Sequence, residues 1–334
     1  MGSNEQLVLT VTAPGEVQIR VGDLPSPTGD EVLVLVRAVG ICGTDLEIID
    51  GTIDPEFVNY PISIGHEFAG EVVIDPRGEF AKGTRVAVEG IVPCWHCQHC
   101  REGRTNLCAT YDEFGFTRDG GCSRYVLVPR RVLHPIASIH DITAATLIEP
   151  GAVVYQGLRR IQPTVGMESL VIGDGTIALL AVHLLSLWSP ASIVVLGKRV
   201  AQRELALKAG ATSFSTELEQ HDYGLVVEAS GSVAGVANAF QSVRRGGKLL
   251  LLGLTPHGAT YPFPIDDAVN RDLEVQASFG YTASAWSKVV DIFNCGRYSP
   301  GFLITHQYPL LDWEKAVNSL RYEEGVRGKI VMIP

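Results

Sequence analysis

The sequence predicts a two-domain α/β protein in which a mostly β N-terminal part is followed by a doubly wound parallel sheet. The length of 334 residues is about twice that of an ordinary single domain. Residues 1 to about 150 carry short β-type runs separated by Gly, Pro and Asp turns. From Ser169 onward, short and nearly continuous apolar runs alternate with helical patterns, which is typical of parallel strands buried on both faces.

The strands expected in the first part are Leu33 to Val39, Arg85 to Val88 and Tyr125 to Val128. Those expected in the parallel sheet are Ser169 to Ile172, Ser192 to Leu196, Leu225 to Glu228, Lys248 to Leu252 and Leu273 to Ala277.

Helices are expected between the strands of the second part. An apolar stripe at i, i+3 and i+4 spacing follows Gly175 and predicts a helix reaching Trp188. Glycine C-caps are expected for the helices Ala201 to Ala209, which stops at Gly210, and Ala234 to Arg245, which stops at Gly246–Gly247. The last stretch, Phe302 to Pro334, returns to the mixed texture of the first part, so we expect it to fold back onto the N-terminal domain.

Charge and hydropathy exclude several classes of protein. The 27 Lys and Arg against 37 Asp and Glu give a net charge of −10, so we expect no nucleic-acid partner and no anionic membrane partner. Hydrophobic residues make up 46% of the chain and charged ones 19%, which excludes intrinsic disorder. The longest apolar stretch, Ser169 to Trp188, contains Asp174 and His183 and does not predict a membrane span. Seven cysteines without an export signal predict a reducing, cytoplasmic setting.

A glycine-rich turn after the first strand of the second part predicts dinucleotide binding. The segment Gly173-Asp174-Gly175-Thr176-Ile177-Ala178 runs from a buried strand into an amphipathic helix as G-x-G-x-x-A. Gly173 permits the tight turn, and Gly175 lets the backbone approach a pyrophosphate. The free N–H groups of the helix start, at Thr176 and Ile177, then face the phosphates. The alternative is an ordinary glycine turn. Ser230, after the strand Leu225 to Glu228, is also expected in the cofactor site.

The end of the second parallel strand favours NADP(H) over NAD(H). NAD-binding proteins place an Asp or Glu here, about twenty residues after the glycine loop, to bind the ribose diol. This chain instead has Gly197-Lys198-Arg199. The glycine leaves room for a 2′-phosphate and the two cations supply its counter-charges. The alternative is a solvated Lys-Arg pair on a loop.

Four cysteines within fifteen residues predict a structural zinc site. Cys94, Cys97, Cys100 and Cys108 are spaced C-x2-C-x2-C-x7-C. Four thiolates on one loop close a tetrahedron around Zn²⁺ and leave no position for a substrate. The short spacings and the absence of an export signal disfavour disulfides. The neighbouring His96 and His99 are alternative ligands that a complete thiolate set makes unnecessary.

A second group of potential ligands is dispersed, and spacing alone does not assemble it into one site. Its segments are Cys42-Gly43-Thr44-Asp45, Gly65-His66-Glu67 and Glu149-Pro150. Together with the four-cysteine loop and the glycine-rich turn, they occur in this order in the zinc-containing medium-chain alcohol dehydrogenase family. The chain resembles that family over almost its whole length. The nearest branch is that of the polyol, sugar and cyclitol dehydrogenases, which keeps the carboxylates of both GHE and EP.

The resemblance implies a GroES-like catalytic domain over residues 1–152, completed by 297–334, and a Rossmann dinucleotide-binding domain over 153–296. It implies two zinc ions per chain, one in the loop 94–108 and one catalytic. Cys42, His66 and either Glu149 or Glu67 correspond to the catalytic ligands, and which glutamate binds directly stays open. Asp45 corresponds to the acceptor that orients His66. Thr44 matches the hydroxyl that bonds the substrate alcohol and passes its proton outward.

The implied activity is hydride transfer between NADP(H) and a secondary alcohol or ketone of a sugar, polyol or cyclitol, with zinc polarising the reacting oxygen. Glu47 stands where many relatives have a relay histidine, as in sugar-oxidising glucose dehydrogenases. The segment from Glu113 to Gly121 is similar to that of cyclitol and aminocyclitol dehydrogenases of the 2-deoxy-scyllo-inosamine type. We therefore expect Glu47, Arg118 and Asp119 to contact a small polyhydroxylated substrate, and the alternative is a solvated loop.

Two other functions stay open from the sequence. Threonine dehydrogenases share CGTD and GHE, but they usually have the relay histidine and use NAD, so Glu47 and Gly197 argue against NAD-dependent oxidation of an amino alcohol. A non-catalytic NADPH-binding zinc protein is the third possibility. Family members are usually dimers or tetramers, so we expect a homodimer or homotetramer.

Overall fold

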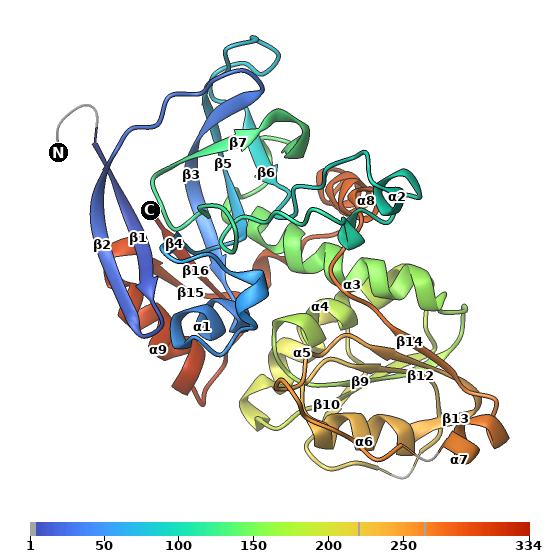
Figure 1. Cartoon of the computed structure of the whole chain (residues 1–334). Helices are drawn as coiled ribbons and strands as arrows, with labels where there is room; N and C mark the ends of the chain where they lie inside the picture. The colour runs from blue at the N-terminus through green and yellow to red at the C-terminus, as the bar shows by residue number, and fades with distance from the viewer. Residues whose placement is uncertain (1–4, 220, 264) are drawn as a thin grey trace. The chain divides into compact units, whose positions relative to one another are not determined.

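The computed structural model describes residues 5–219, 221–263 and 265–334, and the chain divides into two compact units (Figure 1). Unit 1 contains the chain up to Glu149, together with Thr282–Glu323 and Lys329–Pro334. Unit 2 contains Pro150–Tyr281 and Glu324–Gly328. The expected α/β class, with a mostly β part and a doubly wound part, is confirmed.

Unit 1 is built on two β-sheets. A three-stranded sheet has the order β2-β1-β4, and a seven-stranded sheet has the order β15-β16-β3-β5-β6-β8 with β7 also paired to β3. The strands are β1 (Glu5–Ala13), β2 (Glu16–Asp23), β3 (Glu31–Ile41), β4 (Ile62–Ser63), β5 (Glu67–Ile74), β6 (Arg85–Val88), β7 (Tyr125–Pro129), β8 (Leu133–Pro135), β15 (Ile304–Pro309) and β16 (Lys329–Ile333). The helices are α1 (Gly43–Asp50), α2 (Gln98–Arg101), α8 (Ala283–Asn294) and α9 (Trp313–Tyr322).

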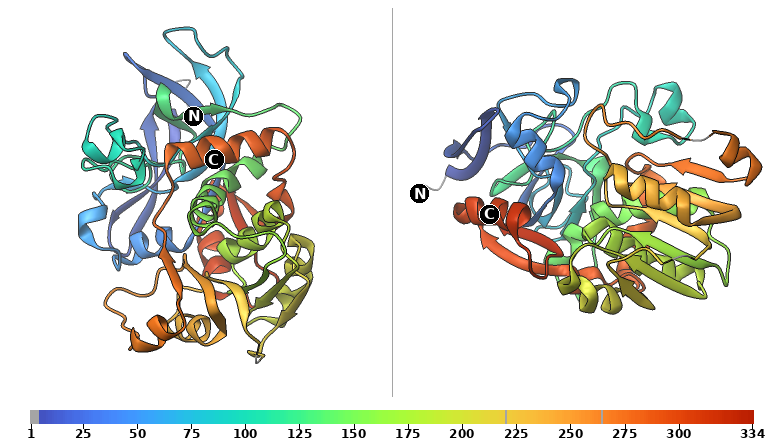
Figure 2. Two further views of the ribbon diagram at one scale, coloured as in Figure 1. Left: turned by 90° about the vertical axis from the view of Figure 1, so that its right-hand side faces the viewer. Right: turned by 90° about the horizontal axis from the view of Figure 1, so that it is seen from below.

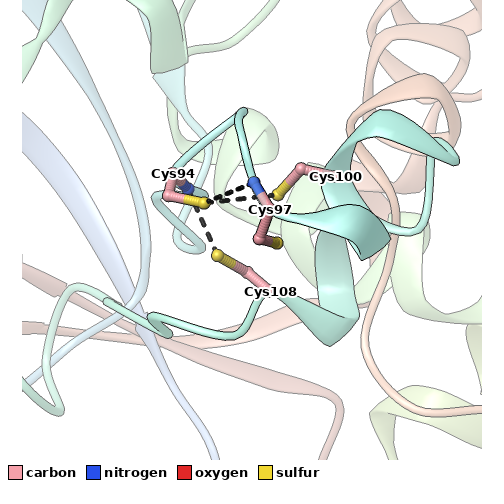
Figure 3. A group of neighbouring side chains, drawn as sticks. All are labelled: Cys94, Cys97, Cys100 and Cys108. Carbon is pink, nitrogen blue, oxygen red and sulfur yellow. Dashed lines mark hydrogen bonds between the residues drawn. The ribbon is translucent and has the colours of Figure 1, made fainter.

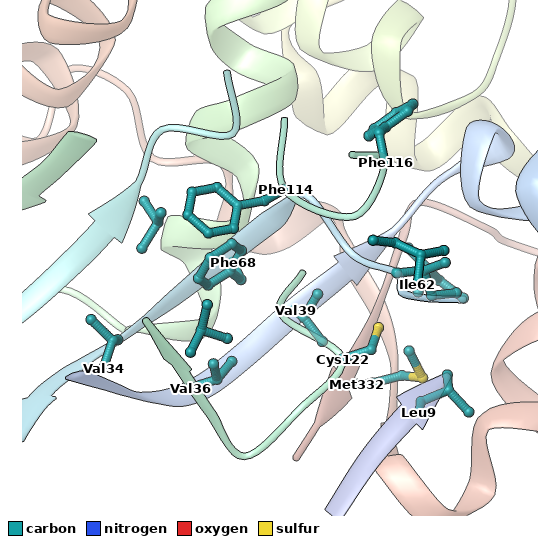
Figure 4. Packing of buried hydrophobic residues seen from close by; sticks show 14 of the residues in the cluster. Leu9, Val34, Val36, Val39, Ile62, Phe68, Phe114, Phe116, Cys122 and Met332 are labelled. Atoms are coloured by element: carbon teal, nitrogen blue, oxygen red, sulfur yellow. The ribbon is translucent and has the colours of Figure 1, made fainter. Parts of the chain in front are cut away.

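The long strand β3 is the centre of unit 1, and most of its residues are buried on both faces. Its inner side chains pack with those of neighbouring strands, as Val34, Val36 and Val39 do around Phe68 (Figure 4). Continuous burial explains why this strand reads as an apolar run rather than as an alternating one.

The C-terminal strand joins this sheet beside β3. Ile330 pairs with Ile41 in antiparallel register, so the end of the chain lies beside its N-terminal third (Figure 2). The last stretch, apart from Glu324–Gly328, thus lies in unit 1 with the N-terminal part of the chain.

Unit 2 is a parallel sheet with the order β11-β10-β9-β12-β13-β14. Numbered from its first strand, this is the 3-2-1-4-5-6 order of dinucleotide-binding folds, and the strand order reverses between β9 and β12. The strands are β9 (Glu168–Ile172), β10 (Ser192–Leu196), β11 (Ser213–Ser215), β12 (Tyr223–Glu228), β13 (Val243–Leu251) and β14 (Glu274–Ala277). The helices are α3 (Ile148–Ile161), α4 (Thr176–Leu185), α5 (Arg203–Ala209), α6 (Val233–Ser242) and α7 (Ile265–Asn270).

The helix caps in unit 2 show one correct prediction and one error. Gly210 has φ of 114° and ends α5, as expected. The helix expected to reach Arg245 and stop at Gly246–Gly247 ends instead at Ser242, and both glycines lie within β13. The Arg271 guanidinium donates to the carbonyl oxygens of Phe240 (2.9 Å) and Val243 (2.8 Å), so an arginine rather than a glycine satisfies this helix end.

The unit boundaries differ from the expected domain boundaries at three places, one of which is the short segment Glu324–Gly328, which belongs to unit 2. Unit 2 begins at Pro150, which lies in the first turn of α3, rather than at residue 153. Helix α8 was expected in the dinucleotide-binding domain, yet it belongs to unit 1, where the Ala283 N–H donates to Thr105 Oγ1 at 2.8 Å. Among the described residues, no helix is both long enough and apolar enough to cross a membrane.

Candidate functional site

The four clustered cysteines converge in unit 1 on a single point. Their sulfur atoms all lie within 4.8 Å of one another, around the short helix α2 (Figure 3). Backbone N–H groups donate to two of them, from Cys94 to Cys108 Sγ at 3.2 Å and from Cys97 to Cys94 Sγ at 3.3 Å. Backbone hydrogen bonds at His96 and Cys97 lower the pKa of Cys94 to about 5, which favours its thiolate. The cluster therefore has the number and spacing of sulfur donors that a tetrahedral Zn²⁺ needs.

A second cluster forms where β3 ends and β5 begins. Gly40 pairs with Glu67 in the antiparallel register of these strands, so Cys42, two residues further on, lies beside His66. Cys42 Sγ is 3.4 Å from His66 Nε2, and one ligand atom each from Cys42, His66 and Glu67 lie within 4.8 Å of one another. This mixed thiolate, imidazole and carboxylate set fits one metal ion and leaves a tetrahedral position open.

Helix α1 fixes the geometry of this cluster through Asp45. Cys42 is the N-cap of α1, so the start of this helix fixes the position of its side chain. The buried Asp45 carboxylate accepts from the backbone N–H of Cys42 (2.9 Å) and of Gly65 (3.2 Å). Its Oδ1 is also 3.7 Å from His66 Nδ1. Burial alone would lower the pKa of His66, but Cys42 and Asp45 raise it above its ordinary value.

Glu67 has a buried counter-ion that the sequence did not indicate. Its carboxylate forms an ion pair with Lys329 on β16, and both side chains are only 2% exposed. Lys329 Nζ also donates to the Ile41 carbonyl oxygen at 3.1 Å. A Cβ at Gly40 would overlap the Glu67 carboxylate, so glycine at this position leaves room for the ion pair. The pair depends on the return of the C-terminal strand, which no local motif predicts.

Two further buried carboxylates surround the cluster. Burial raises the pKa of Glu149 to about 8, while His66 opposes the rise. Glu149 is not part of the group of three whose ligand atoms lie within 4.8 Å. Glu113, which was missed, accepts a short hydrogen bond from the Tyr111 hydroxyl, and burial raises its pKa while His66 opposes the rise. The sequence around Glu113 gave no signal that its carboxyl group interacts with His66.

The other expected substrate residues lie on α1 and on the loop before β7. Thr44 is half-buried and Glu47 is exposed, and the two are three residues apart on one face of α1. Arg118 forms an ion pair with Asp112 (Nε to Oδ2, 3.0 Å) and lies over the Phe114 ring. Asp119 Oδ1 accepts from the Ser63 N–H at 2.8 Å. Arg118 and Asp119 therefore also hold this loop in place.

The glycine-rich turn of unit 2 lies between β9 and α4. Gly173 has φ of 122°, and a Cβ there would lie 2.9 Å from the Ala229 carbonyl oxygen. A Cβ at Gly175 would meet nothing within 4 Å, so the second glycine faces open space at the start of α4. Thr176 and Ile177 are the first residues of α4 and stay partly exposed. This turn fits a dinucleotide pyrophosphate.

The end of β10 is arranged differently from the expected pair of free cations. Lys198 is exposed and forms no ion pair within the described part of the chain. Arg199 forms an ion pair with Asp174 (Nη2 to Oδ1, 2.9 Å). Ser230 is exposed, and its hydroxyl donates to the buried Glu228 at 2.5 Å. A Cβ at Gly197 would lie 2.6 Å from Phe214 Cζ, so close packing requires this glycine.

Two family descriptions match the chain. Residues 28–138 match the alcohol dehydrogenase GroES-like domain, and residues 176–294 match the zinc-binding dehydrogenase domain. The sorbitol dehydrogenase of Bacillus subtilis is 32% identical over 96% of this chain and 94% of its own length. An L-threonine 3-dehydrogenase of Aeromonas hydrophila is 28% identical over 95% of this chain and 96% of its own length.

Solved structures share the fold over the whole chain. A zinc-binding dehydrogenase of Sinorhizobium meliloti bound to NADP has a TM-score of 0.92 and 26% identity, covering 99% of this chain and 100% of its own. An alcohol dehydrogenase of Escherichia coli complexed with NADH has a TM-score of 0.91 and 26% identity over the same shares. Similar folds thus bind either dinucleotide.

Proposed function

The chain belongs to the zinc-containing medium-chain alcohol dehydrogenase family, among relatives of the polyol and sugar branch, and we propose a specific activity for it. It transfers a hydride between NADP(H) and a secondary alcohol or ketone of a sugar, polyol or cyclitol. The observation that carries this proposal is the convergence of Cys42, His66 and Glu67 beside further buried acids. Because its relatives are dehydrogenases, the non-catalytic alternative is not retained.

Two zinc ions per chain are part of the proposal. The closed set of Cys94, Cys97, Cys100 and Cys108 would hold a structural ion, and Cys42 and His66 would hold the catalytic one with Glu67 or Glu149. The 4.8 Å grouping supports Glu67 as the direct ligand in the described conformation. When bound, zinc acts as a Lewis acid on the reacting oxygen and the nicotinamide exchanges the hydride.

The protein's own groups orient the substrate and move its proton. Thr44 follows the metal-ligand candidate Cys42 by two residues, and its hydroxyl would accept the proton of the substrate alcohol. Glu47 lies on the same face of α1 and is exposed, so it offers an acceptor on the way to solvent. The Asp45 carboxylate accepts from the Cys42 backbone N–H and lies near His66 Nδ1, the ring nitrogen that does not face Cys42.

The dinucleotide would bind at the carboxyl ends of β9, β10 and β12, where the strand order reverses. Gly173, Gly175, Thr176 and Ile177 would contact the pyrophosphate through backbone atoms, and Ser230 would lie at the next strand end. The preference for NADP(H) rests on Gly197, Lys198 and Arg199. An exposed lysine and no acidic residue after β10 favour a 2′-phosphate over a free diol.

A polyhydroxylated substrate suits the polar character of the catalytic cluster. Glu113 and Glu149 are buried carboxyl groups that interact with His66, and hydroxyl groups of a sugar or cyclitol would satisfy them. Glu47, Arg118 and Asp119 are the other proposed substrate contacts, Arg118 and Asp119 from the loop that they help to hold. A substrate with a single alkyl chain would offer no hydroxyl groups to these acids.

A substrate panel tests this function directly. Sugars, polyols, cyclitols, aminocyclitols and L-threonine are offered with NADP and NAD, and the corresponding ketones with NADPH and NADH. We expect the highest kcat/KM for a polyhydroxylated substrate with the phosphorylated cofactor. Metal analysis of the same preparation should give two zinc ions per chain. Turnover limited to simple alcohols, or a preference for NAD(H), would overturn the corresponding part of the proposal.

The second candidate is oxidation of an amino alcohol, because L-threonine 3-dehydrogenases are among the relatives. That activity would favour NAD and L-threonine in the panel. The absence of an acidic residue at Gly197-Lys198-Arg199 and the presence of Glu47 argue against it.

Assembly into a dimer or tetramer is the last part of the proposal. Strand β14 is the edge of the parallel sheet, and Val275 on it is 43% exposed. Ile265 and Val269 on the preceding helix are more than 70% exposed. An unpaired edge with apolar neighbours would be covered by the same edge of a second copy. Light scattering coupled to size-exclusion chromatography tests this, and a monomer would contradict it.

A further inference from the structure

The side chain of Asp174 fills the space between the glycine-rich turn and the end of β10. Its Oδ2 accepts from the backbone N–H groups of Lys198 (2.9 Å) and Arg199 (2.8 Å). Its Oδ1 accepts from Arg199 Nη2 (2.9 Å) and Nε (3.3 Å). One carboxylate therefore takes two consecutive backbone donors and one edge of a guanidinium.

The backbone of Asp174 is fixed as firmly as its side chain. The Asp174 carbonyl oxygen accepts from Arg199 Nη2 (3.2 Å) and from the carboxamide of Gln202 (2.6 Å). Gln202 is fully buried and also exchanges hydrogen bonds with the backbone of Arg327 at 2.7 and 2.9 Å. Arg199 is thus held against the glycine-rich turn rather than extended into solvent.

The donors around the Asp174 carboxylate are those of an anion-binding site, and the carboxylate takes the place of the anion. Consecutive backbone N–H groups and a guanidinium are the donors that bind phosphate in other proteins. Here Asp174 takes these donors, and Arg199 Nη1 is the guanidinium nitrogen with no hydrogen-bond partner within the described residues. The summed charge of Asp174, Lys198 and Arg199 is about +1 instead of the +2 expected without the acid.

We propose that Asp174 is a specificity-determining residue that neutralises Arg199 and so restrains the enzyme's preference for a dinucleotide with a 2′-phosphate. The inference rests on the proposed binding of the adenosine ribose at the end of β10. Lys198 then supplies the main attraction for the phosphate, and the site still accepts the unphosphorylated ribose. Removing the charge of Asp174 would release Arg199 towards the ligand.

Asp174→Asn is the informative change because it removes the charge and keeps an oxygen acceptor for the backbone donors. The ligands are adenosine 2′,5′-bisphosphate and 5′-AMP, which differ only in the 2′-phosphate, and calorimetry measures both dissociation constants on the zinc-loaded enzyme. We expect Asp174→Asn to bind the bisphosphate about tenfold more tightly, or about 1.4 kcal/mol. The affinity for 5′-AMP should change by less than about twofold. The ratio of kcat/KM for NADPH to kcat/KM for NADH should rise by the same factor as the bisphosphate affinity, through a lower KM for NADPH.

Two further variants show whether the effect acts through Arg199. In an Arg199→Ala background, Asp174→Asn should change bisphosphate affinity by less than about threefold, because no guanidinium remains to be released. Asp222→Asn removes an exposed acid of the same unit at the amino end of β12, away from the carboxyl ends of the strands, and should change neither ligand. If Asp174→Asn folds poorly, Asp174→Ser also removes the charge and keeps an oxygen acceptor.

Weaker bisphosphate binding by the folded Asp174→Asn enzyme would overturn the proposal, because Asp174 would then orient Arg199 for the phosphate. An equal loss for both ligands would also overturn it and assign a purely structural role. A wild type that prefers NADH would contradict the proposed NADP(H) preference alone. The change produced by Asp174→Asn is measured against the wild type and would still decide the present inference.

Discussion

The two ligand clusters of unit 1 are assembled in opposite ways. The four cysteines of the closed cluster lie within fifteen residues, and one loop around α2 brings them together. The three ligand candidates of the open cluster come from the end of β3 and the start of β5, and the counter-ion of Glu67 comes from the C-terminal strand. A local segment can form the first cluster, whereas only the completed sheet can form the second.

The donors of the clusters differ as well. The closed set consists of four sulfur atoms with backbone N–H donors around them, which suits an ion that never changes its ligands. The open set mixes a thiol, an imidazole and a carboxyl group among further acids, Glu113 and Glu149. Mixed donors and adjacent titratable groups suit a site at which charge develops during the reaction. The difference supports the proposed division, in which the closed cluster serves folding and the open one serves chemistry.

The largest expected effect comes from breaking the open cluster. Cys42→Ala should lower kcat by about a thousandfold or more, because several kcal/mol of charge stabilisation at the reacting oxygen are lost. Zinc content should fall from two ions per chain to one, while the dissociation constant for NADPH stays within about threefold. Steady-state kinetics, metal analysis and fluorescence titration measure the three quantities.

The control for Cys42→Ala is Cys295→Ala, since Cys295 is an exposed thiol outside both clusters. It should keep the kcat and both zinc ions of the wild type. Retained turnover in Cys42→Ala with a single zinc ion bound would show that the open cluster is not the catalytic one.

Breaking the closed cluster should lower the stability of the protein more than its kcat. Cys97→Ser removes one of the four sulfur donors, and the free energy of unfolding should fall by several kcal/mol, on the order of the folding energy that such sites supply. The kcat of the fraction that stays folded should fall by less than about tenfold, because the open cluster is intact. Thermal unfolding and active-site titration test this. Full loss of activity at unchanged stability would contradict the division between the clusters.

Sequence patterns predicted the local features well. The strands Ser192–Leu196 and Arg85–Val88 lie where their apolar runs are, and Gly210 caps its helix. The closed cluster was likewise visible, because its cysteines are adjacent in the chain. The predicted end of α6 was wrong because Arg271, from a distant segment, caps this helix. The two glycines were also ambiguous, since glycine occurs at bends of strands as well as at helix ends.

The missed residues share a different cause. Lys329 and Asp174 stand at positions where no motif specifies the residue, and each gains its role from a partner on another segment. Glu113 gains its role from His66, which is distant in the sequence. Cys42, His66 and Glu67 were linked through resemblance, because spacing cannot state that β3 and β5 pair with Gly40 opposite Glu67. Long-range register is the information that the one-dimensional pattern lacked.

The smallest effect is expected from a substitution of Asp45, which orients the open cluster but is not itself a ligand candidate. Asp45→Asn removes the charge that faces His66 and one of the two oxygens that accept from the Cys42 and Gly65 N–H groups. The affinity of the open cluster for zinc should fall by about 10- to 100-fold, and the closed cluster should not change. Competition with a chromophoric chelator resolves the two affinities.

Asp50→Asn is the matched control, because Asp50 is an exposed acid on the same helix that pairs with Arg321. Equal zinc affinities in Asp45→Asn and Asp50→Asn would show that Asp45 supports the fold of α1 but not the geometry of the metal ligands.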